Sequence, residues 1–541
     1  MKISMKTVSS LVKVFTGEET AFINAEKKGS CFVGERYNLQ ILLRSSENIY
    51  GAELLVEGVN GNCAVYGVRE IKAGREYGYG LPDDYVLHSP NGYYPDLLVE
   101  EKTFDVKKGE NTVLWVSLSD LKAGENGIVF TFVKEGRALA SCAYKLTVIG
   151  AALPETDIPF TNWMHYDCIA EKTGTEPFSA AFYACFERYL TAYVEAGFNT
   201  LLIPTFTPAL DTAVGGERRT TQLVKVYLEN GEYRFDFSEL EKFLDFVSER
   251  GIQYYEFAHL YTQWGAEFCP KVIAIVDGEE KKIFGWETGS ESEEYKTFLN
   301  AYLPALNRLL EGRGIVQNCF IHLSDEPHEE HVERYKRLYD FVKPLIGKMR
   351  TFDALSEFSF YQKNAVDLPA VLTSRTRPFE VEKVEHFAYY CCDPCTNYES
   401  NRFFAMPSER TRSIGVQLYR NGARGFLHWG YNFYNAQYSV RVIDPYEETD
   451  AGGRFPSGDS YIVYPYGQGV RKSIRYFLMN EAFDDYRACR LAESVVGKEK
   501  TTALLKKHGV YGYSCYPKTG AAFKRMREAL NQLVEKTIKK K

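Results

Sequence analysis

The sequence predicts an N-terminal β-sandwich followed by a (β/α)8 barrel of the TIM type, with a C-terminal helical extension. Two observations support this class. Residues 1–150 contain short runs of strand-forming residues and no long amphipathic helix, whereas strands alternate with helices from about residue 160. We expect three domains: the sandwich at 1–150, the barrel at 155–490, and the helical extension, packed on the barrel, at 491–541.

The N-terminal strands are short and separated by turns rich in Gly and Asn, such as Asn60-Gly-Asn62. They are rich in Val, Ile, Leu and aromatic residues, which fit a pleated surface. The expected strands lie at 37–43, 52–56, 112–118 and 127–132. Residues 150–157 carry no such pattern and are the predicted linker.

Eight apolar runs follow the linker, and most are separated by helical patterns. Eight parallel strands close most economically as a barrel. The expected strands lie at 161–167, 200–204, 253–257, the run from 319, 350–353, 370–373, 385–390 and 425–429. The expected helices lie at 178–196, 237–249, 292–310, 330–345 and 408–420. The connections 205–235 and 258–290 exceed ordinary loop lengths, which indicates a function or a lid.

The composition excludes several classes of protein. The chain has 541 residues, 45% hydrophobic and 25% charged, with a net charge of -7, so we expect no nucleic-acid partner. No apolar stretch is long enough for a bilayer span, so we expect no membrane insertion. The N-terminus shows no signal-peptide pattern, so we expect a cytoplasmic protein with reduced thiols.

We expect no metal and no cofactor. Cys391, Cys392 and Cys395 form the one cysteine cluster, with His386 nearby, but the paired spacing of a structural zinc site is missing. The run from His328 to His331 lacks the i, i+4 spacing of a zincin helix. Neither a Gly-rich phosphate loop nor a hydrolase serine elbow is present.

Two adjacent acids, Asp325 and Glu326, end the predicted fourth barrel strand, and Pro327 stops it. The carboxyl ends of barrel strands form the catalytic face. At a strand end both carboxylates can reach one pocket, where one is pushed towards its neutral form. A neutral acid beside a charged carboxylate suits glycoside hydrolysis. The alternative is that Asp325 caps the next helix and Glu326 is solvated.

Polar and aromatic residues at other strand ends and in the long loops are candidates for substrate binding. Trp286, Tyr390 and Trp429 are candidates for stacking on a sugar ring. The candidates for polar contacts are His165, Asp167, Arg218, Arg219, His259 and Gln263. Packing would explain the aromatic residues equally well, and surface ion pairs the arginines.

Several motifs, in their order along the chain, resemble those of a known family. They are Trp163-Met-His-Tyr-Asp167, the runs 216–224, 259–266 and 284–288, Ser324-Asp-Glu-Pro327, and the runs 427–432, 457–465, 473–475 and 484–486. The chain resembles glycoside hydrolase family 123 and, more broadly, the bacterial domain of unknown function 4091 family. The resemblance covers roughly residues 155–490, with a matching β-rich N-terminal domain.

The resemblance implies a retaining exo-β-N-acetylgalactosaminidase that uses substrate-assisted catalysis on an oligosaccharide or glycoconjugate. Glu326 would be the general acid/base. Asp325 would orient the 2-acetamido group of the substrate and stabilise the oxazolinium ion, so no metal is required. Three roles stay open for the sandwich: it binds glycan itself, it shields the barrel, or it contributes to a homodimer interface.

Two rival interpretations remain open from the residues. Glu326 can pair with Glu256 or Glu287 in an ordinary mechanism, which retains configuration at a carboxylate separation of about 5 Å and inverts it at roughly 6.5–9.5 Å. Alternatively, the chain is a non-catalytic carbohydrate-binding or scaffold protein, because a fold does not fix a function.

Overall fold

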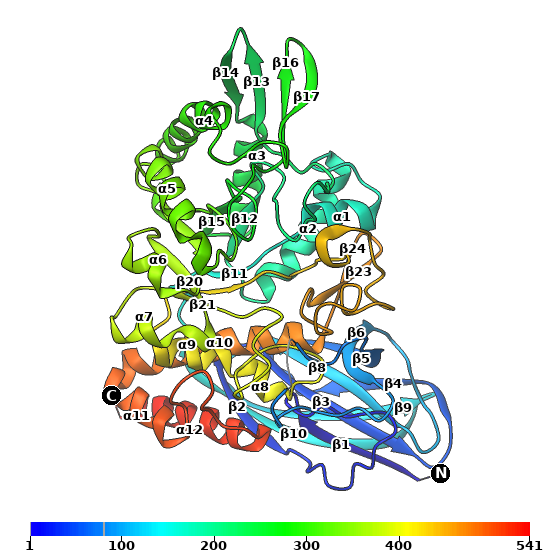
Figure 1. Cartoon of the computed structure of the whole chain (residues 1–541). Helices are drawn as coiled ribbons and strands as arrows, with labels where there is room; N and C mark the ends of the chain where they lie inside the picture. Colours follow the sequence, from blue (N-terminus) through cyan, green and yellow to red (C-terminus); the bar gives the residue numbers. More distant parts are fainter. Residues whose placement is uncertain (1, 79–81, 541) are drawn as a thin grey trace.

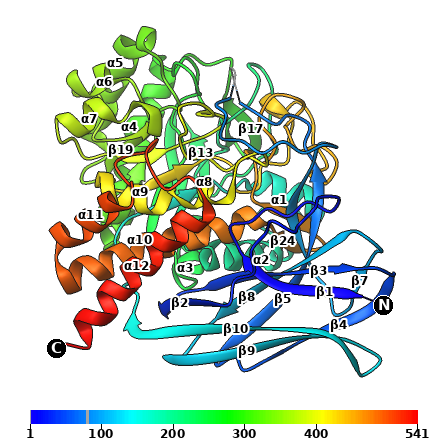
Figure 2. The same cartoon turned by 90° about the horizontal axis from the view of Figure 1, so that it is seen from below.

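The computed structural model describes residues 2–78 and 82–540 and confirms the predicted fold class. Two five-stranded sheets form the N-terminal sandwich, in the orders β1-β3-β8-β5-β6 and β2-β10-β9-β4-β7 (Figures 1 and 2). Apolar side chains from both sheets meet in one core. The strands are β1 (Ile3–Ser9), β2 (Lys28–Val33), β3 (Tyr37–Ser45), β4 (Ile49–Glu57), β5 (Asn62–Lys72), β6 (Tyr93–Glu100), β7 (Phe104–Val106), β8 (Asn111–Ser119), β9 (Gly124–Lys134) and β10 (Arg137–Ala152).

Eight parallel strands close the barrel, and each overlaps a segment predicted from the sequence. In barrel order they are β11 (Phe160–Asn162), β12 (Thr200–Ile203), β15 (Tyr254–Phe257), β18 (Cys319–Ile321), β19 (Arg350–Ala354), β20 (Leu368–Leu372), β21 (Phe387–Tyr389) and β22 (Phe426–His428). The helices up to the last barrel strand are α1 (Tyr166–Thr173), α2 (Ala180–Glu195), α3 (Ser238–Ser248), α4 (Glu293–Gly312), α5 (Val332–Val342), α6 (Phe358–Gln362), α7 (Arg377–Val381), α8 (Ser408–Arg412) and α9 (Ile414–Asn421).

Most barrel strands are shorter than predicted, and two of them, the first and the fourth, end well before the expected residue. The first ends at Asn162 because the backbone N–H of His165 donates to the Asn432 side chain (2.8 Å), outside the sheet, and α1 then begins. The fourth ends at Ile321 because the N–H of Leu323 donates to the Asp353 carboxylate (3.0 Å) and not to a neighbouring strand. The residues that follow Asn162 and Ile321 on the catalytic face are therefore not part of a strand.

The two long connections carry strands that the sequence did not predict. They contain β13 (Lys225–Glu229), β14 (Glu232–Asp236), β16 (Val272–Val276) and β17 (Glu279–Phe284), which pair in the order β14-β13-β16-β17. This four-stranded sheet projects from the barrel at the top of Figure 1. A two-stranded sheet, β23 (Val463–Tyr466) with β24 (Gly469–Lys472), follows the last barrel strand.

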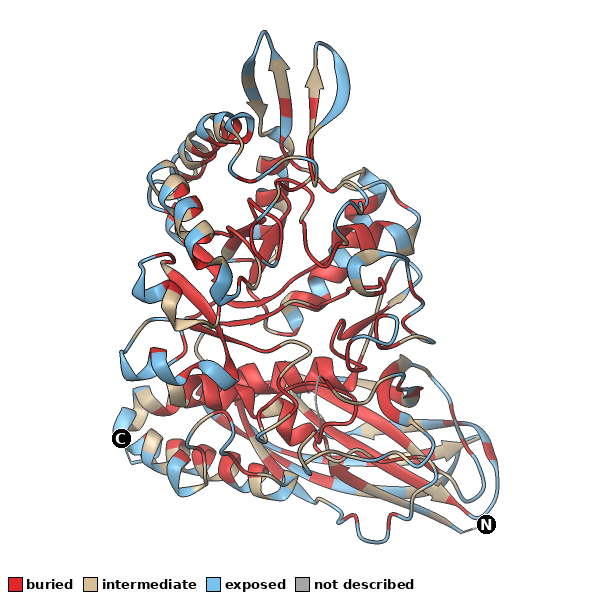
Figure 3. Cartoon of the chain, in the orientation of Figure 1, coloured by how far each residue is buried: buried red, intermediate tan, exposed pale blue. Residues whose placement is uncertain are grey.

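Helix α10 (Ile474–Val496) joins the barrel to the sandwich and spans residue 490, the expected end of the barrel domain. Every residue from Ile474 to Tyr486 is buried, and this part of the helix is red in Figure 3. Helices α11 (Lys498–Lys507) and α12 (Gly520–Ile538) pack against it. No helix in the described ranges is both long enough and apolar enough to cross a bilayer.

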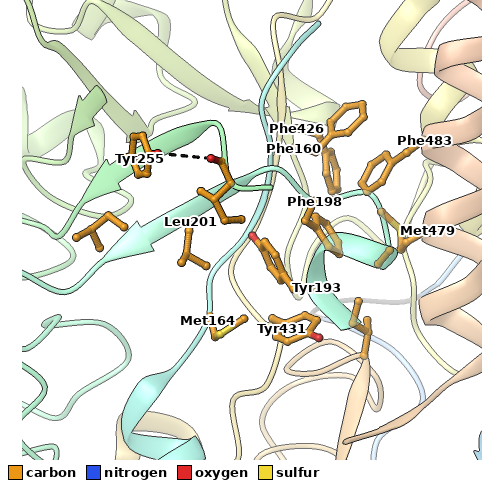
Figure 4. Close-up of a cluster of buried hydrophobic side chains, with 14 of the residues drawn as sticks. Phe160, Met164, Tyr193, Phe198, Leu201, Tyr255, Phe426, Tyr431, Met479 and Phe483 are labelled. Atoms are coloured by element: carbon orange, nitrogen blue, oxygen red, sulfur yellow. Dashed lines mark hydrogen bonds between the residues drawn. The ribbon is translucent and has the colours of Figure 1, made fainter. Parts of the chain in front are cut away.

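Aromatic rings on α10 contact both the barrel and the sandwich. Phe483 stacks on Phe160 of the first barrel strand, with ring centroids 4.0 Å apart (Figure 4). One turn and a half earlier, Phe477 stacks on Trp115 of β8 in the sandwich at 5.7 Å. Gly415 of α9 has no room for a side chain, because an added Cβ would lie 1.7 Å from the carbonyl oxygen of Ala482. The first half of the helix is thus packed against the sandwich, the barrel and α9.

A buried ion pair also crosses this junction. The Arg475 guanidinium donates to Asp96 of β6 through Nε (2.8 Å) and the second terminal nitrogen (2.9 Å). Its remaining nitrogen donates to the carbonyl oxygens of Gly458 and Tyr461, each at 2.5 Å. The bidentate geometry and the extra acceptors satisfy a cation that water cannot reach.

We expect Arg475→Met to destabilise the protein by about 3–5 kcal/mol, because it leaves the buried Asp96 carboxylate without its partner. Urea unfolding followed by tryptophan fluorescence measures the loss. The double variant Arg475→Met/Asp96→Leu should recover part of it, and Arg69→Met, which breaks the exposed pair with Glu101, should leave the midpoint nearly unchanged. An unchanged midpoint for Arg475→Met would refute the role given to this pair.

Candidate active site

A cavity of about 240 Å³ opens at the carboxyl ends of the barrel strands. Loops that follow seven of the eight strands, or the strand ends themselves, supply its walls. The lining residues are Trp163, Leu210, Asp211, Gln263, Trp264, Asp325, Glu326, Ala354, Tyr389, Cys391, Cys392, Leu427, Trp429, Gln437 and Phe455. The barrel interior below is filled by packed apolar side chains. The cavity therefore has the location at which TIM barrels carry their active sites.

Asp325 and Glu326 both line this cavity, although they are adjacent in the chain. Glu326 adopts a left-handed backbone conformation with φ 44°, which is uncommon outside glycine. Its N–H donates to the carbonyl oxygen of Ala354 (3.1 Å), and the carbonyl oxygen of Asp325 accepts from the N–H of Trp264 (2.8 Å). These bonds fix the turn that brings two neighbouring carboxylates to one side.

The Glu326 carboxylate is held through one oxygen. Tyr389 Oη donates to Glu326 Oε1 (2.9 Å), and Cys391 Sγ lies 4.0 Å from the same atom. The Tyr389 hydroxyl also lies 3.3 Å from Ser356 Oγ, which fixes its position. Within the described part of the chain, both donors meet Oε1, so Oε2 is the oxygen free to meet a ligand.

Burial raises the pKa of both acids above their ordinary values, and the neighbouring charge of Glu326 raises the pKa of Asp325 further. The hydrogen bond from Tyr389 acts in the opposite direction on the pKa of Glu326. Two carboxylates this close do not ionise independently, and the pair retains a proton at a pH where ordinary carboxylates have lost it. The pair can therefore present one neutral acid and one charged carboxylate.

A buried charged triad lies in the barrel core next to these acids. His322 Nδ1 lies 3.1 Å from Asp353 Oδ1, and His322 Nε2 lies 3.2 Å from Glu256 Oε2. Burial lowers the pKa of His322, but the hydrogen bonds to the two carboxylates outweigh it and raise the pKa to about 9. His322 is thus an imidazolium at neutral pH, and its charge favours the ionised form of Asp325.

Three residues of this region, His259, His322 and Asp353, bring potential metal-ligand atoms within 4.8 Å of one another. Both nitrogens of His322 already face carboxylates. The rings of His259 and His322 stack with centroids 4.2 Å apart and planes 19° apart, so their in-plane lone pairs run side by side and do not converge. The geometry fits an ion-paired core better than a metal centre.

Gln263 and Trp429 are the two substrate-binding candidates that line the cavity. Gln263 Oε1 accepts a hydrogen bond from the backbone N–H of Asp211, and its Nε2 donates to the carbonyl oxygen of Thr212 (3.2 Å). Gln263 thus anchors the loop after β12. The Trp429 indole N–H donates to Asp459 (3.1 Å), which fixes its ring in the wall.

Three other candidates form a buried chain behind that wall. His165 Nε2 lies 2.9 Å from the carbonyl oxygen of Trp429. Arg218 donates to Asp167 (Nε to Oδ2, 2.8 Å) and lies 3.1 Å from His165 Nδ1. A further bond from Arg218 to the carbonyl oxygen of Leu210 (3.0 Å) ties this chain to the cavity wall. These residues support lining groups and do not line the cavity themselves.

The remaining four candidates lie away from the cavity. His259 is buried beside His322 in the barrel core. Arg219 pairs with Glu176 at 2.6 Å on the surface. The Trp286 indole donates to the carbonyl oxygen of Gly216 (2.9 Å) in a separate small cavity, and the Tyr390 hydroxyl donates to Met479 of α10 (3.4 Å).

Several lining residues were missed as site candidates. Tyr389 follows from strand alternation, because Phe387 and Tyr389 point into the barrel while Tyr390 points out. Asp211 and Trp264 lie in irregular loops with positive φ values of 41° and 56°, for which the sequence carries no periodic signal. Cys391 and Cys392, considered above only as metal ligands, are wall residues.

Comparisons with known proteins agree with this fold. A family 123 glycoside hydrolase from Clostridium perfringens superposes with a TM-score of 0.76 at 14% identity, covering 100% of this chain and 99% of that one, which shows a shared fold. A family 39 glycoside hydrolase from Bacteroides cellulosilyticus has 10% identity and a TM-score of only 0.31, with 81% of this chain and 80% of that chain covered. None of the curated proteins matches the sequence.

A family model also matches the sequence. The model described as "Glycoside hydrolase 123, catalytic domain" matches residues 163–492, a range that includes every lining residue of the cavity, Asp325 and Glu326 among them. This range covers more than half of the chain. The chain therefore belongs to glycoside hydrolase family 123.

Proposed function

We propose that the protein is a retaining exo-β-N-acetylgalactosaminidase that acts on an oligosaccharide or glycoconjugate through an oxazolinium intermediate. The observation that carries the proposal is the placement of Asp325 and Glu326 in one cavity, with Glu326 held through a single oxygen. Family membership supports a carbohydrate substrate. The Clostridium perfringens relative was described in the context of glycolipid glycan hydrolysis, which is consistent with a glycoconjugate substrate here.

In the first step, the carbonyl oxygen of the substrate's acetamido group attacks the anomeric carbon. Glu326 gives its proton to the glycosidic oxygen, and the leaving group departs as an alcohol. Asp325 accepts a hydrogen bond from the acetamido N–H and stabilises the positive charge of the oxazolinium ring. The substrate supplies the nucleophile, which is the exception to the two-carboxylate scheme.

In the second step, the Glu326 carboxylate removes a proton from water, and the water oxygen attacks the anomeric carbon. The bond between that carbon and the acetamido oxygen breaks, and the acetamido group is restored. Two inversions at the anomeric carbon give overall retention. The fixed position of Glu326 Oε1 against Tyr389 leaves the same oxygen, Oε2, to serve as acid in one step and as base in the next.

The positions of Glu256 and Glu287 do not favour the first rival mechanism. Glu256 is wholly buried and accepts hydrogen bonds from the Trp163 indole (2.8 Å) and His322. Glu287 lies 3.4 Å from Lys282 of the projecting sheet. Neither lines the cavity. Asp211 does line it, and burial raises its pKa to about 6, so it is the carboxylate to test against the proposal.

We expect Glu326→Gln and Asp325→Asn each to lower kcat by two to four powers of ten on a β-linked GalNAc glycoside, because each change removes a transition-state interaction. With a dinitrophenyl leaving group, which departs without protonation, Glu326→Gln should lose much less in the first step than Asp325→Asn. Asp211→Asn is the matched control and should stay within about tenfold of the wild type. A near-normal rate for either main variant would refute these roles.

The acetamido group itself should be required for turnover. We expect release of nitrophenol from the aryl β-GalNAc glycoside, inhibition of that reaction by the matching thiazoline, and no release from the aryl β-galactoside. The measurement is a spectrophotometric rate at equal enzyme concentration. Cleavage of the galactoside at a comparable rate would discard the substrate-assisted mechanism, and loss of that activity in Asp211→Asn would identify the second carboxylate.

The pH profile of kcat/KM should be bell-shaped, because activity needs the pair to hold one proton. Both limbs should lie at higher pH than ordinary carboxylates would give, since burial raises both pKa values. Tyr389→Phe removes the hydrogen bond that lowers the pKa of Glu326, so the alkaline limb should move to higher pH. Tyr390→Phe, whose hydroxyl contacts Met479, is the matched control, and equal profiles for the two variants would contradict this account.

A further inference from the structure

Two exposed aromatic side chains stand together at the rim of the cavity. Trp264 follows β15 and is 39% exposed, and Tyr438 follows β22 and is 41% exposed. Their ring centroids lie 5.5 Å apart, with the planes at 81°. Trp264 lines the cavity, and so does Gln437, the neighbour of Tyr438. The pair is therefore continuous with the catalytic cavity.

The exposure of Trp264 is unusual in this chain. Of its five tryptophans, Trp115 and Trp163 are buried and Trp286 and Trp429 are partly buried, whereas Trp264 is exposed. A large aromatic ring left in water loses the burial that normally stabilises it. Two exposed valines lie close to Tyr438 along the backbone: Val440 is two residues further on, and Val214 follows Ala213, whose N–H donates to the carbonyl oxygen of Tyr438. Apolar surface gathered beside a cavity marks a binding surface.

Backbone hydrogen bonds hold both rim aromatic residues in place. Both have left-handed backbone conformations, with φ 56° at Trp264 and 62° at Tyr438, which persist only where the surrounding structure holds them. The N–H of Trp264 donates to the carbonyl oxygen of Asp325 (2.8 Å). The N–H of Tyr438 donates to the Asp211 carboxylate (3.1 Å), and its carbonyl oxygen accepts from Ala213 (3.0 Å). One of these anchors is thus the backbone of a proposed catalytic residue.

Building on the proposed function, we propose that Trp264 and Tyr438 form the binding surface for the first sugar of the leaving group. The packed barrel interior closes the cavity below, so a chain whose terminal sugar occupies it must leave across the rim. Sugar rings present C–H groups that carry partial positive charge, and aromatic faces carry partial negative charge, so the two stack favourably. The perpendicular rings offer one face and one edge, which suits a pyranose with both apolar and hydroxyl-bearing sides.

The test compares two substrates that differ only beyond the glycosidic oxygen: methyl β-GalNAc, whose leaving group is too small to reach the rim, and a disaccharide of GalNAc β-linked to galactose. We expect Trp264→Ala and Tyr438→Ala each to lower kcat/KM on the disaccharide roughly 10–100-fold more than on the methyl glycoside. Trp264→Phe should recover part of the loss, because it keeps an aromatic face. Tyr466→Ala, which removes a more exposed aromatic outside the cavity lining, should change neither value.

The outcomes separate the rim assignment from the proposed function. Equal losses on the two substrates would overturn the rim assignment while leaving the N-acetylgalactosaminidase intact. A wild-type protein that cleaves neither substrate would overturn the proposed function and the rim assignment with it. A larger loss on octyl β-GalNAc than on the disaccharide would also overturn the sugar assignment, because it would make the rim a surface for alkyl chains.

Discussion

The site depends on one backbone turn. In a regular strand, Asp325 and Glu326 would point to opposite sides of the sheet, one into the barrel and one into the surrounding helices. The N–H of Leu323 donates to the Asp353 carboxylate, which ends the β-ladder of the fourth barrel strand. The left-handed conformation of Glu326 then turns the chain. Adjacent carboxylates can therefore serve one substrate. In the same turn, the carbonyl oxygen of Asp325 accepts a hydrogen bond from the N–H of Trp264. This backbone bond holds the loop after β15 beside the two acids.

Charge in the barrel core gives this arrangement a second constraint. Two acids in a half-buried cavity would both favour the neutral form, and a catalytic pair needs one of them charged. His322 supplies the compensating positive charge from the barrel core, where Glu256 and Asp353 keep it protonated. Glu256 also holds the Trp163 indole in the cavity wall, so the groups that set the electrostatics of the site also shape it. Glu256, one of the two carboxylates considered as a rival catalyst, thus has a structural role.

The sequence predicted the parts of the molecule that carry a clear hydrophobic pattern. All eight barrel strands overlap their expected segments, because buried parallel strands are continuous apolar runs bounded by turn residues. It did not predict the sheet built from the two long connections, in which β14 and β17 bury only Phe284 between them and so carry no apolar run. Asp325 and Glu326 stood out because they end an apolar run, and strand alternation would have favoured Tyr389 over Tyr390. The rim residue Trp264 depends on a loop conformation set by tertiary hydrogen bonds, which no local pattern encodes.

The central position of α10 has a consequence for synthesis of the chain. Both the sandwich face at Trp115 and the barrel end at Phe160 are covered by a helix that begins at Ile474. A ribosome adding about 5–20 residues per second needs on the order of tens of seconds to travel from the end of the sandwich to that helix. During this interval the nascent sheets carry an uncovered apolar face, the state in which unfinished domains aggregate or recruit chaperones. Completion of both bodies is thus a late event in translation, set by the order of the elements along the chain.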